Sequence, residues 1–279
     1  MTDEATAFVP GHVTGFFTTD PADDPTKAGS RGGGIALSDG VTVTVERSDE
    51  RSVSLNGVDI EIEAVERVLD ALRATVAVRA ETPLPLGSGF GVSGATALGA
   101  ALGTNAVLDR GLSENELVTI AHGAEVQAGT GLGDVVAQAR GGVPLRLEPG
   151  GPQDNYIDAV PARGRLEYHV IGELSTEAVL DGDTAELTRA GEKALSRVVK
   201  EPTTESFVRA SRQFAREAGL LTDDVRSVLE DVAAADGDGA MAMLGETVFT
   251  IGSGLTDAGY DATVTEIHPG GATLLDRSG

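Results

Sequence analysis

The chain has 279 residues, 41% hydrophobic and 23% charged, a composition typical of a packed globular protein of one or two domains. Asp and Glu total 44 against 21 Lys and Arg, and the resulting net charge of −23 disfavours nucleic acid or an anionic membrane as a partner. The absence of cysteine excludes disulfides and thiolate chemistry. No apolar run approaches the roughly 20 residues that span a bilayer, and the acidic N-terminus does not resemble a signal peptide. We therefore expect a cytoplasmic protein.

The chain is predicted to begin with β-strands. Residues 6–18 form a short β-like segment that Pro10-Gly11 interrupts, and a polar loop rich in turn-forming residues follows. Valine and threonine alternate over 41–45, which predicts a half-buried strand within 34–48. Asn56-Gly57 then predicts a hairpin turn.

Helices are predicted next. Apolar residues recur at steps of three and four over 62–75, the pattern of an amphipathic helix, and a strand is expected over 75–82. The small apolar residues of 93–107 predict a helix packed closely against a sheet. Ser113–Glu116 matches a capping box, so we expect a helix that starts there and ends at Gly129.

The pattern changes after the polar stretch 148–156, which we interpret as a linker between two lobes, residues 1–152 and 153–279. Beyond it we expect a strand over 166–174, helices near 184–199, 204–218 and 223–235, and further strands within 240–252 and 262–275. Strands and helices mix without strict alternation, so the predicted fold class is α+β in two lobes.

A glycine-rich loop within Pro83–Leu98 precedes the small-residue helix, and such a loop lets backbone N–H groups approach an anion. Residues 89–94 match G-x-G-x-x-G, but Pro85 separates them from the preceding strand, and Asp109, about 20 residues on, lies in a turn, so the dinucleotide-binding interpretation fails. A P-loop is excluded because 28–192 contains no lysine. Tight packing of a helix on a sheet is the alternative interpretation.

Residues 83–97 resemble the phosphate-binding motif Pro-x-x-x-Gly-Leu-Gly-Ser-Ser-Ala-Ala of the GHMP kinases, with GFGVSGA in place of GLGSSAA. FVPGHVTGFF and GTGLGDVVAQARGG resemble two other family elements in the same order, whereas the C-terminal glycine-rich motif is kept only at Gly245. Within the family, AFVPGHVTGFF, GSRGGGIAL and AMLGETVF resemble the archaeal pantoate kinase branch. The resemblance implies an N-terminal ribosomal-protein-like α/β lobe, a C-terminal ferredoxin-like α+β lobe, and phosphorylation of the 4-hydroxyl of pantoate by ATP in coenzyme A biosynthesis.

The resemblance also implies an ATP- and Mg²⁺-dependent site. The expected phosphate-binding residues are Pro85, Gly87, Ser88, Gly89, Gly91, Val92, Ser93 and Gly94. Ser93 and Glu125 are the expected metal ligands, although from its place beside an apolar stripe Glu125 could equally form an ion pair at the edge of the core. Asp134 is the expected base or charge stabiliser, with a turn or N-cap residue as the alternative. His12 is expected to contact the substrate or to orient Asp134, and a structural hydrogen-bonding role is the alternative.

Pantoate carries a carboxylate, which arginine recognises in a bidentate manner. We expect Arg31 to bind it, assisted by Ser30 and His12, with Lys27 and Arg140 as further candidates. A surface ion pair is the alternative for each of the three cations.

Several alternatives stay open. The substrate could be homoserine, a mevalonate derivative or shikimate, or the chain could be a relative that binds a metabolite without catalysis. A homodimer is plausible by resemblance alone. The acidic residues are spread along the chain, which favours a protein of a high-salt cytoplasm over a merely acidic one.

Overall fold

The first sheet is long, twisted and mostly antiparallel in this computed structural model, which describes residues 3–172 and 184–275. Its strands follow the order β12-β1-β2-β5-β3-β4, with β6 pairing with β2 and β7 with β6. The bounds are β1 (Glu4–Phe17), β2 (Gly32–Arg47), β3 (Ser52–Leu55), β4 (Val58–Asp59), β5 (Val76–Glu81), β6 (Val143–Glu148), β7 (Tyr156–Val160) and β12 (Thr273–Leu274). β1 and β2 form the longest pairing, and β3 lies parallel to β5.

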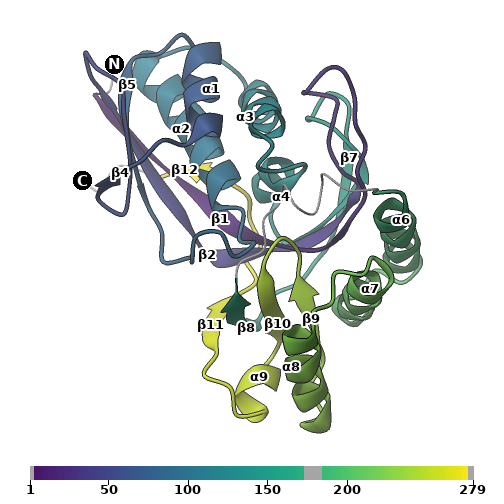
Figure 1. Ribbon diagram of the computed structural model, residues 1–279. Helices are drawn as coiled ribbons and strands as arrows, with labels where there is room; N and C mark the ends of the chain where they lie inside the picture. The colour runs from purple at the N-terminus through teal and green to yellow at the C-terminus, as the bar shows by residue number, and fades with distance from the viewer. Residues whose placement is uncertain (1–2, 173–183, 276–279) are drawn as a thin grey trace.

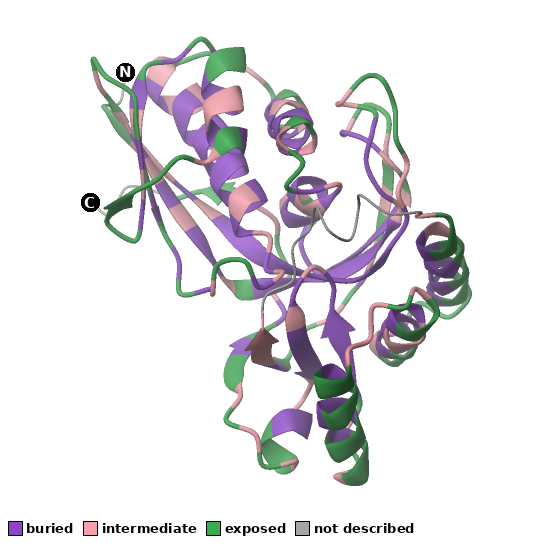
Figure 2. Cartoon of the chain, in the orientation of Figure 1, coloured by how far each residue is buried: buried purple, intermediate pink, exposed green. Residues whose placement is uncertain are grey.

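Four helices lie on one side of this sheet (Figure 1). They are α1 (Glu63–Ala71), α2 (Val92–Leu108), α3 (Glu114–Ala128) and α4 (Asp134–Arg140). The small residues of α2 let it approach the strands closely, as predicted: a Cβ added at Gly99 would lie 2.4 Å from Cγ2 of Val43. Figure 2 shows the resulting core, in which α2 and the facing strands are largely buried.

The second sheet is four-stranded and antiparallel, in the order β11-β8-β10-β9. It consists of β8 (Arg165–Gly172), β9 (Gly239–Ala242), β10 (Glu246–Ile251) and β11 (Thr263–Glu266), with α8 (Asp223–Ala234) and α9 (Gly254–Asp257) beside it. Helices α6 (Ala185–Lys200) and α7 (Thr204–Glu217) pack on each other and against β1. There Phe207 and Phe214 contact Phe16 and Phe17, with ring centroids 5.7 Å apart in both pairs.

The α+β prediction is confirmed, and so are several local signals. Asn56 and Gly57 form the turn between β3 and β4, both with positive φ. Ser113 and Glu116 form the capping box of α3, and Gly129 ends that helix with φ 71°. None of the helices in the part of the chain described here is long and apolar enough to cross a membrane.

Other elements differ from the predictions. Pro10-Gly11 does not interrupt the first strand: β1 runs through it with a shift in its register against β2. Helix α1 ends at Ala71, because Arg73 adopts φ 46° and the chain then enters β5. The predicted strand over 166–174 corresponds to β8, and its last two residues lie outside the described residues.

The stretch 148–156 is not a linker between sheets. It connects β6 to β7, which pair in the first sheet, and the chain passes to the second sheet between Val160 and Arg165. The polar composition therefore marks a loop within one sheet. The division into lobes at 1–152 and 153–279 stays a prediction, and the strand pairing favours a boundary further toward the C-terminus.

Candidate functional site

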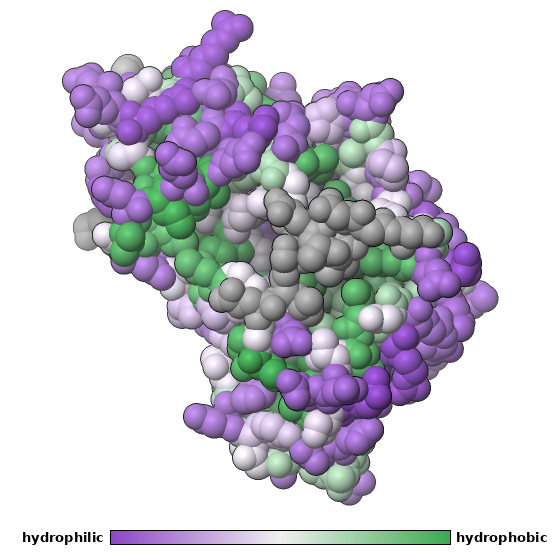
Figure 3. Space-filling view, viewed as in Figure 1, coloured by the Kyte–Doolittle hydropathy of each residue, from purple (hydrophilic) through white to green (hydrophobic). Residues whose placement is uncertain are grey.

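A cleft of about 690 Å³ lies where the glycine-rich loop meets the start of α2. Seven of the eight residues predicted to bind phosphate line it: Pro85, Gly87, Gly89, Gly91, Val92, Ser93 and Gly94. Leu55, Ile60 and Ile62 form an apolar wall, and Figure 3 shows hydrophobic side chains at the surface around β4, next to this wall. Met243 and Leu244 reach the cleft from the second sheet.

The loop fits an anion because of its backbone. Gly91 is the N-cap of α2 with φ 64°, and no side chain caps the N–H groups at this end of the helix. Gly89, with φ 85°, passes close to the second sheet, where a Cβ would lie 2.7 Å from the carbonyl oxygen of Met243. The positive end of a buried helix and uncapped N–H groups together favour a phosphate at this position.

Ser88 is the exception among the predicted phosphate residues. Its side chain is buried away from the cleft, and its carbonyl oxygen accepts a hydrogen bond of 3.2 Å from Oγ1 of Thr247 on β10. The residue therefore joins the loop to the second sheet.

Glu125 points from α3 into the same cleft as Ser93. Its side chain is buried; Oε1 accepts a hydrogen bond from Thr130, and Oε2 has no hydrogen-bond partner within residues 3–172 and 184–275. Burial, and secondarily the negative charge of Asp134, raise the pKa of Glu125 to about 7. A buried carboxylate oxygen without a partner is a suitable ligand for a divalent cation, so these residues fit a metal.

Metal binding here would need oxygen atoms from a ligand. The described residues contain no group of three or more His, Cys, Asp or Glu side chains placed to hold a metal ion. This composition suits Mg²⁺, which commonly takes one or two carboxylates together with phosphate oxygens.

Asp134 is the first residue of α4 and forms a pair with a buried histidine of β1. Nδ1 of His12 lies 2.7 Å from Oδ1 of Asp134, and Oγ1 of Thr14 donates to the same oxygen at 3.4 Å. Burial lowers the pKa of His12 more than its bond to Asp134 raises it, so the imidazole is neutral and its Nδ1–H donates. Burial by itself would raise the pKa of Asp134, but the His12 hydrogen bond and the charge of Arg146 hold it below its usual value.

His12 thus lies behind Asp134 and has no exposed surface. A Cβ added at Gly34 would lie 2.0 Å from its Nε2, so the ring packs against β2. Of the two catalytic roles considered for His12, this geometry fits the orienting role.

Arg146, on β6, is a buried cation that the sequence analysis did not single out. Its Nε donates to the carbonyl oxygen of Ser30 at 3.3 Å and its Nη2 to Oγ of Ser30 at 3.2 Å, whereas Nη1 is buried without a partner among the described residues. It lines a small pocket, with a free volume of about 10 Å³, together with Thr14, Phe17, Ser30, Leu132, Gly133, Asp134 and Leu244. The sequence feature that could have identified Arg146 is its place as the single charged residue in the apolar stretch VPLRL. Burial of an arginine costs free energy unless a ligand or another group pairs with it.

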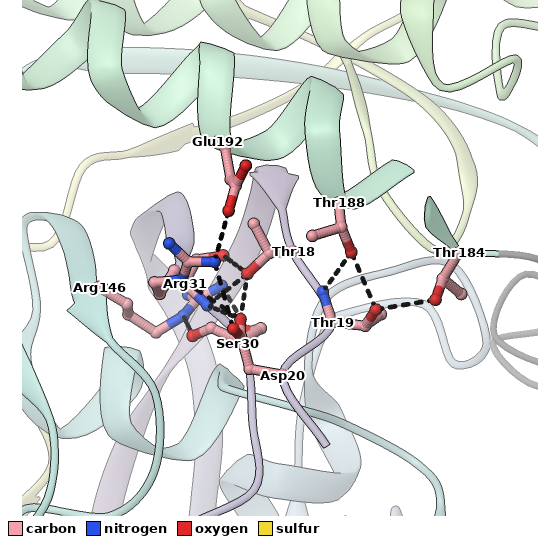
Figure 4. Close-up of polar contacts among 9 residues, drawn as sticks. All are labelled: Thr18, Thr19, Asp20, Ser30, Arg31, Arg146, Thr184, Thr188 and Glu192. Atoms are coloured by element: carbon pink, nitrogen blue, oxygen red, sulfur yellow. Dashed lines mark hydrogen bonds and ion pairs between the residues drawn. The ribbon is translucent and has the colours of Figure 1, made fainter. Parts of the chain in front are cut away.

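The other predicted substrate cations lie elsewhere. Arg31 is engaged by Asp20 and Glu192, so it matches the ion-pair alternative (Figure 4). Lys27 is exposed, and Arg140 is exposed beside Arg163 in a separate cavity of about 500 Å³. Among the predicted substrate residues, Ser30 lies beside Asp134 in the small pocket, and His12 contacts Asp134 from behind.

The chain is similar to known proteins over most of its length. Residues 59–142 match the model of the GHMP kinases N terminal domain. The pantoate kinase of Methanocaldococcus jannaschii is 35% identical over 88% of this chain and 91% of that protein, and the pantoate kinase of Methanospirillum hungatei is 34% identical over 97% of this chain and 96% of that protein. A solved structure described as a phosphotransferase related to the CoA biosynthesis pathway superposes with a TM-score of 0.88 at 29% identity, covering 99% of this chain and 100% of that chain.

Proposed function

This chain belongs to the pantoate kinase family within the GHMP kinases, and on that premise we propose which of its residues transfer a phosphoryl group from ATP to the 4-hydroxyl of (R)-pantoate. The enzyme is a phosphotransferase with an alcohol group as acceptor. The observation that carries the assignment of residues is the position of Asp134, which lines both the glycine-loop cleft and the small Arg146 pocket.

ATP would occupy the larger cleft. The N–H groups of the glycine-rich loop and the uncapped start of α2 would bind its phosphates, and Ser93 lies at that helix end. The apolar wall of Leu55, Ile60 and Ile62 is suited to the adenine ring, because an aromatic base is best stabilised by hydrophobic contact on its faces.

Glu125 and Ser93 would hold Mg²⁺ together with phosphate oxygens. Binding of the cation would give Oε2 of Glu125 the partner it lacks and would favour the charged form of that carboxylate. When bound, Mg²⁺ neutralises part of the charge on the transferring phosphate.

Asp134 would act on the acceptor hydroxyl. His12 and Thr14 occupy Oδ1, which fixes the carboxylate plane and leaves Oδ2 for the substrate. The hydroxyl oxygen forms a bond to the γ-phosphorus, the bond from that phosphorus to the bridging oxygen breaks, and ADP leaves with the electron pair. The proton passes to Asp134, which is ionised beforehand because its pKa is low.

Arg146 and Ser30 would bind the carboxylate of pantoate. Nη1 of Arg146 is a buried donor with no partner in the part of the chain that the structure describes, and a carboxylate would satisfy it with a charge-assisted hydrogen bond. Phe17 and Leu132 line the same pocket, whose free volume of about 10 Å³ has to widen before the two methyl groups can pack against them.

An ADP-release assay tests the proposal. Purified protein in molar KCl receives ATP and Mg²⁺ with pantoate, homoserine, mevalonate, phosphomevalonate or shikimate, each offered separately. We expect turnover with pantoate alone and 4-phosphopantoate as the product in ³¹P NMR. Turnover with another alcohol would leave the kinase activity in place and show that the substrate is not pantoate. No turnover by the folded protein would favour a protein that binds a metabolite without catalysis.

Two further expectations concern the state of the enzyme. We propose a homodimer, which light scattering after size exclusion in molar KCl would detect. We also propose a cytoplasmic location at high salt, and raised stability in molar KCl over dilute buffer would support it, because salt screens a net charge of −23.

A further inference from the structure

Arg31 joins three segments that are far apart in the sequence. Its Nη2 donates to Oδ1 of Asp20 at 3.2 Å and to Oε1 of Glu192 at 2.9 Å, and its Nε lies 3.4 Å from Oδ2 of Asp20. Asp20 follows β1, Arg31 precedes β2 and Glu192 lies on α6 (Figure 4). We name these three side chains the Arg31 clamp.

The clamp brackets the backbone of Ser30. The N–H of Thr18 donates to the carbonyl oxygen of Arg31 at 2.8 Å, and the N–H of Arg31 donates to Oγ1 of Thr18 at 3.0 Å. On the other side of Ser30, Asp20 and Gly29 exchange two backbone hydrogen bonds of 2.9 and 3.0 Å. The position of Ser30 is therefore set by the same residues that hold the Arg31 side chain.

Ser30 in turn holds Arg146. Both hydrogen bonds that the Arg146 guanidinium makes within the described residues go to Ser30, one to its carbonyl oxygen and one to its hydroxyl. The pair packs against Gly133, where a Cβ would lie 2.6 Å from Nε of Arg146 and 2.7 Å from Oγ of Ser30. A displacement of Ser30 would thus be passed to the guanidinium of Arg146.

We propose that the Arg31 clamp is a positioning device for the substrate carboxylate: it fixes Ser30, and through Ser30 it aims Nη1 of Arg146 into the pocket. The inference rests on the proposed function of that pocket and gives Arg31 a role without contact to the substrate. It also makes α6 part of the binding site, since Glu192 is the only clamp member on that helix and Thr188 contributes hydrogen bonds to the same loop at Thr19.

The charges explain why arginine is needed. Asp20 and Glu192 bring two carboxylates to one point, and Arg31 satisfies both with a single planar group. Without that cation the two carboxylates repel each other, and α6 and the loop before Arg31 are driven apart.

Steady-state kinetics of Arg31→Ala test the proposal. We expect the KM for pantoate to rise about 10- to 100-fold, the cost in affinity of losing a hydrogen bond to a charged group. The kcat at saturating pantoate and the KM for ATP should change by less than about two-fold, as for a surface substitution. Arg31→Lys keeps the charge without the planar fork, so it should restore part of the loss.

Arg51→Ala is the matched control. Arg51 also pairs with two carboxylates, Glu66 and Asp70, and its side chain is 31% exposed compared with 25% for Arg31. It directly precedes β3, pairs with carboxylates of α1 and lines neither pocket, so its removal should leave the KM for pantoate unchanged.

A double-mutant cycle separates positioning from direct contact. If Arg31 acts through Arg146, the KM for pantoate of Arg31→Ala/Arg146→Lys should equal that of Arg146→Lys alone within about two-fold. Multiplying effects would mean that Arg31 touches the substrate itself and would overturn the proposal, as would a fall in kcat with no change in KM. If the wild type phosphorylates pantoate and Arg31→Ala has the same KM for pantoate, the positioning role of the Arg31 clamp is wrong and the proposed function stands. If the wild type does not phosphorylate pantoate, the proposed function itself is wrong.

Discussion

Replacing Glu125 with Gln should stabilise the ligand-free protein above neutral pH. The pKa of Glu125 is raised by burial from 4.5 to about 7, so the native state keeps a proton that the unfolded chain loses. Stability from this group is therefore fully present below pH 4.5 and is lost as the pH rises through 7. At about 1.4 kcal/mol per pKa unit the full loss is about 3.5 kcal/mol, of which about 2.5 kcal/mol falls between pH 5 and pH 8.

Thermal unfolding of both proteins, without ATP or metal, measures this effect. Gln does not titrate, so the Tm of Glu125→Gln minus that of the wild type should be about 4 °C higher at pH 8 than at pH 5 for a chain of this length. Glu114→Gln, at an exposed position of the same helix, is the control and should give the same difference at both pH values. Adding ATP and Mg²⁺ should raise the Tm of the wild type and leave Glu125→Gln nearly unchanged, because the variant lacks the carboxylate ligand.

A Tm difference that is equal at pH 5 and pH 8 would refute the reasoning, since it would mean that Glu125 titrates normally in the native state. An equal stabilisation of both proteins by Mg²⁺ with ATP would refute the assignment of Glu125 as a metal ligand without touching the pH argument.

Three other substitutions have definite expected outcomes. Asp134→Asn should lower kcat about 10²- to 10⁴-fold while calorimetry shows unchanged ATP binding, because it removes the proton acceptor and leaves the glycine-rich loop intact; a wild-type kcat would contradict the assigned role. Gly99→Ala should destabilise the protein by about 1–3 kcal/mol in urea unfolding, because its Cβ would lie 2.4 Å from a methyl group of Val43; unchanged stability would mean that α2 moves freely on the sheet. Glu167→Gln should cost about 1.5–3 kcal/mol in the same assay, because the buried carboxylate accepts hydrogen bonds of 3.0 Å from the N–H groups that start α9; a neutral outcome would show that its charge is not needed there.

Local features were predictable from the sequence because they depend on residues close together in the chain. The capping box at Ser113 and Glu116 closes over three residues, and the Asn56-Gly57 turn depends on two residues that tolerate positive φ. The glycine-rich loop belongs to the same class, since its phosphate-binding backbone and the helix it starts are adjacent in the chain.

Composition gave a wrong prediction where it indicated surface exposure and not which elements a segment connects. The polar stretch 148–156 has the residues of a linker, yet it joins two paired strands, because any surface turn favours the same residues. The predicted break at Pro10-Gly11 failed for a related reason: pairing with β2 along most of β1 absorbs the irregularity as a shift in register.

The partners of the charged residues were decided by tertiary structure alone. The sequence indicated that an arginine should meet the substrate and selected Arg31 from its glycine-rich setting, but Arg31 is paired with Glu192, 161 residues away. The sequence separation between the hydrogen-bonded residues His12 and Asp134 is 122 residues, and that between Arg146 and Ser30 is 116 residues. The sequence by itself determined which chemical groups the protein has and the local backbone that binds phosphate. Only the packing of the sheet, α4 and α6 decided which cation is neutralised by carboxylates and which is left buried with a free donor.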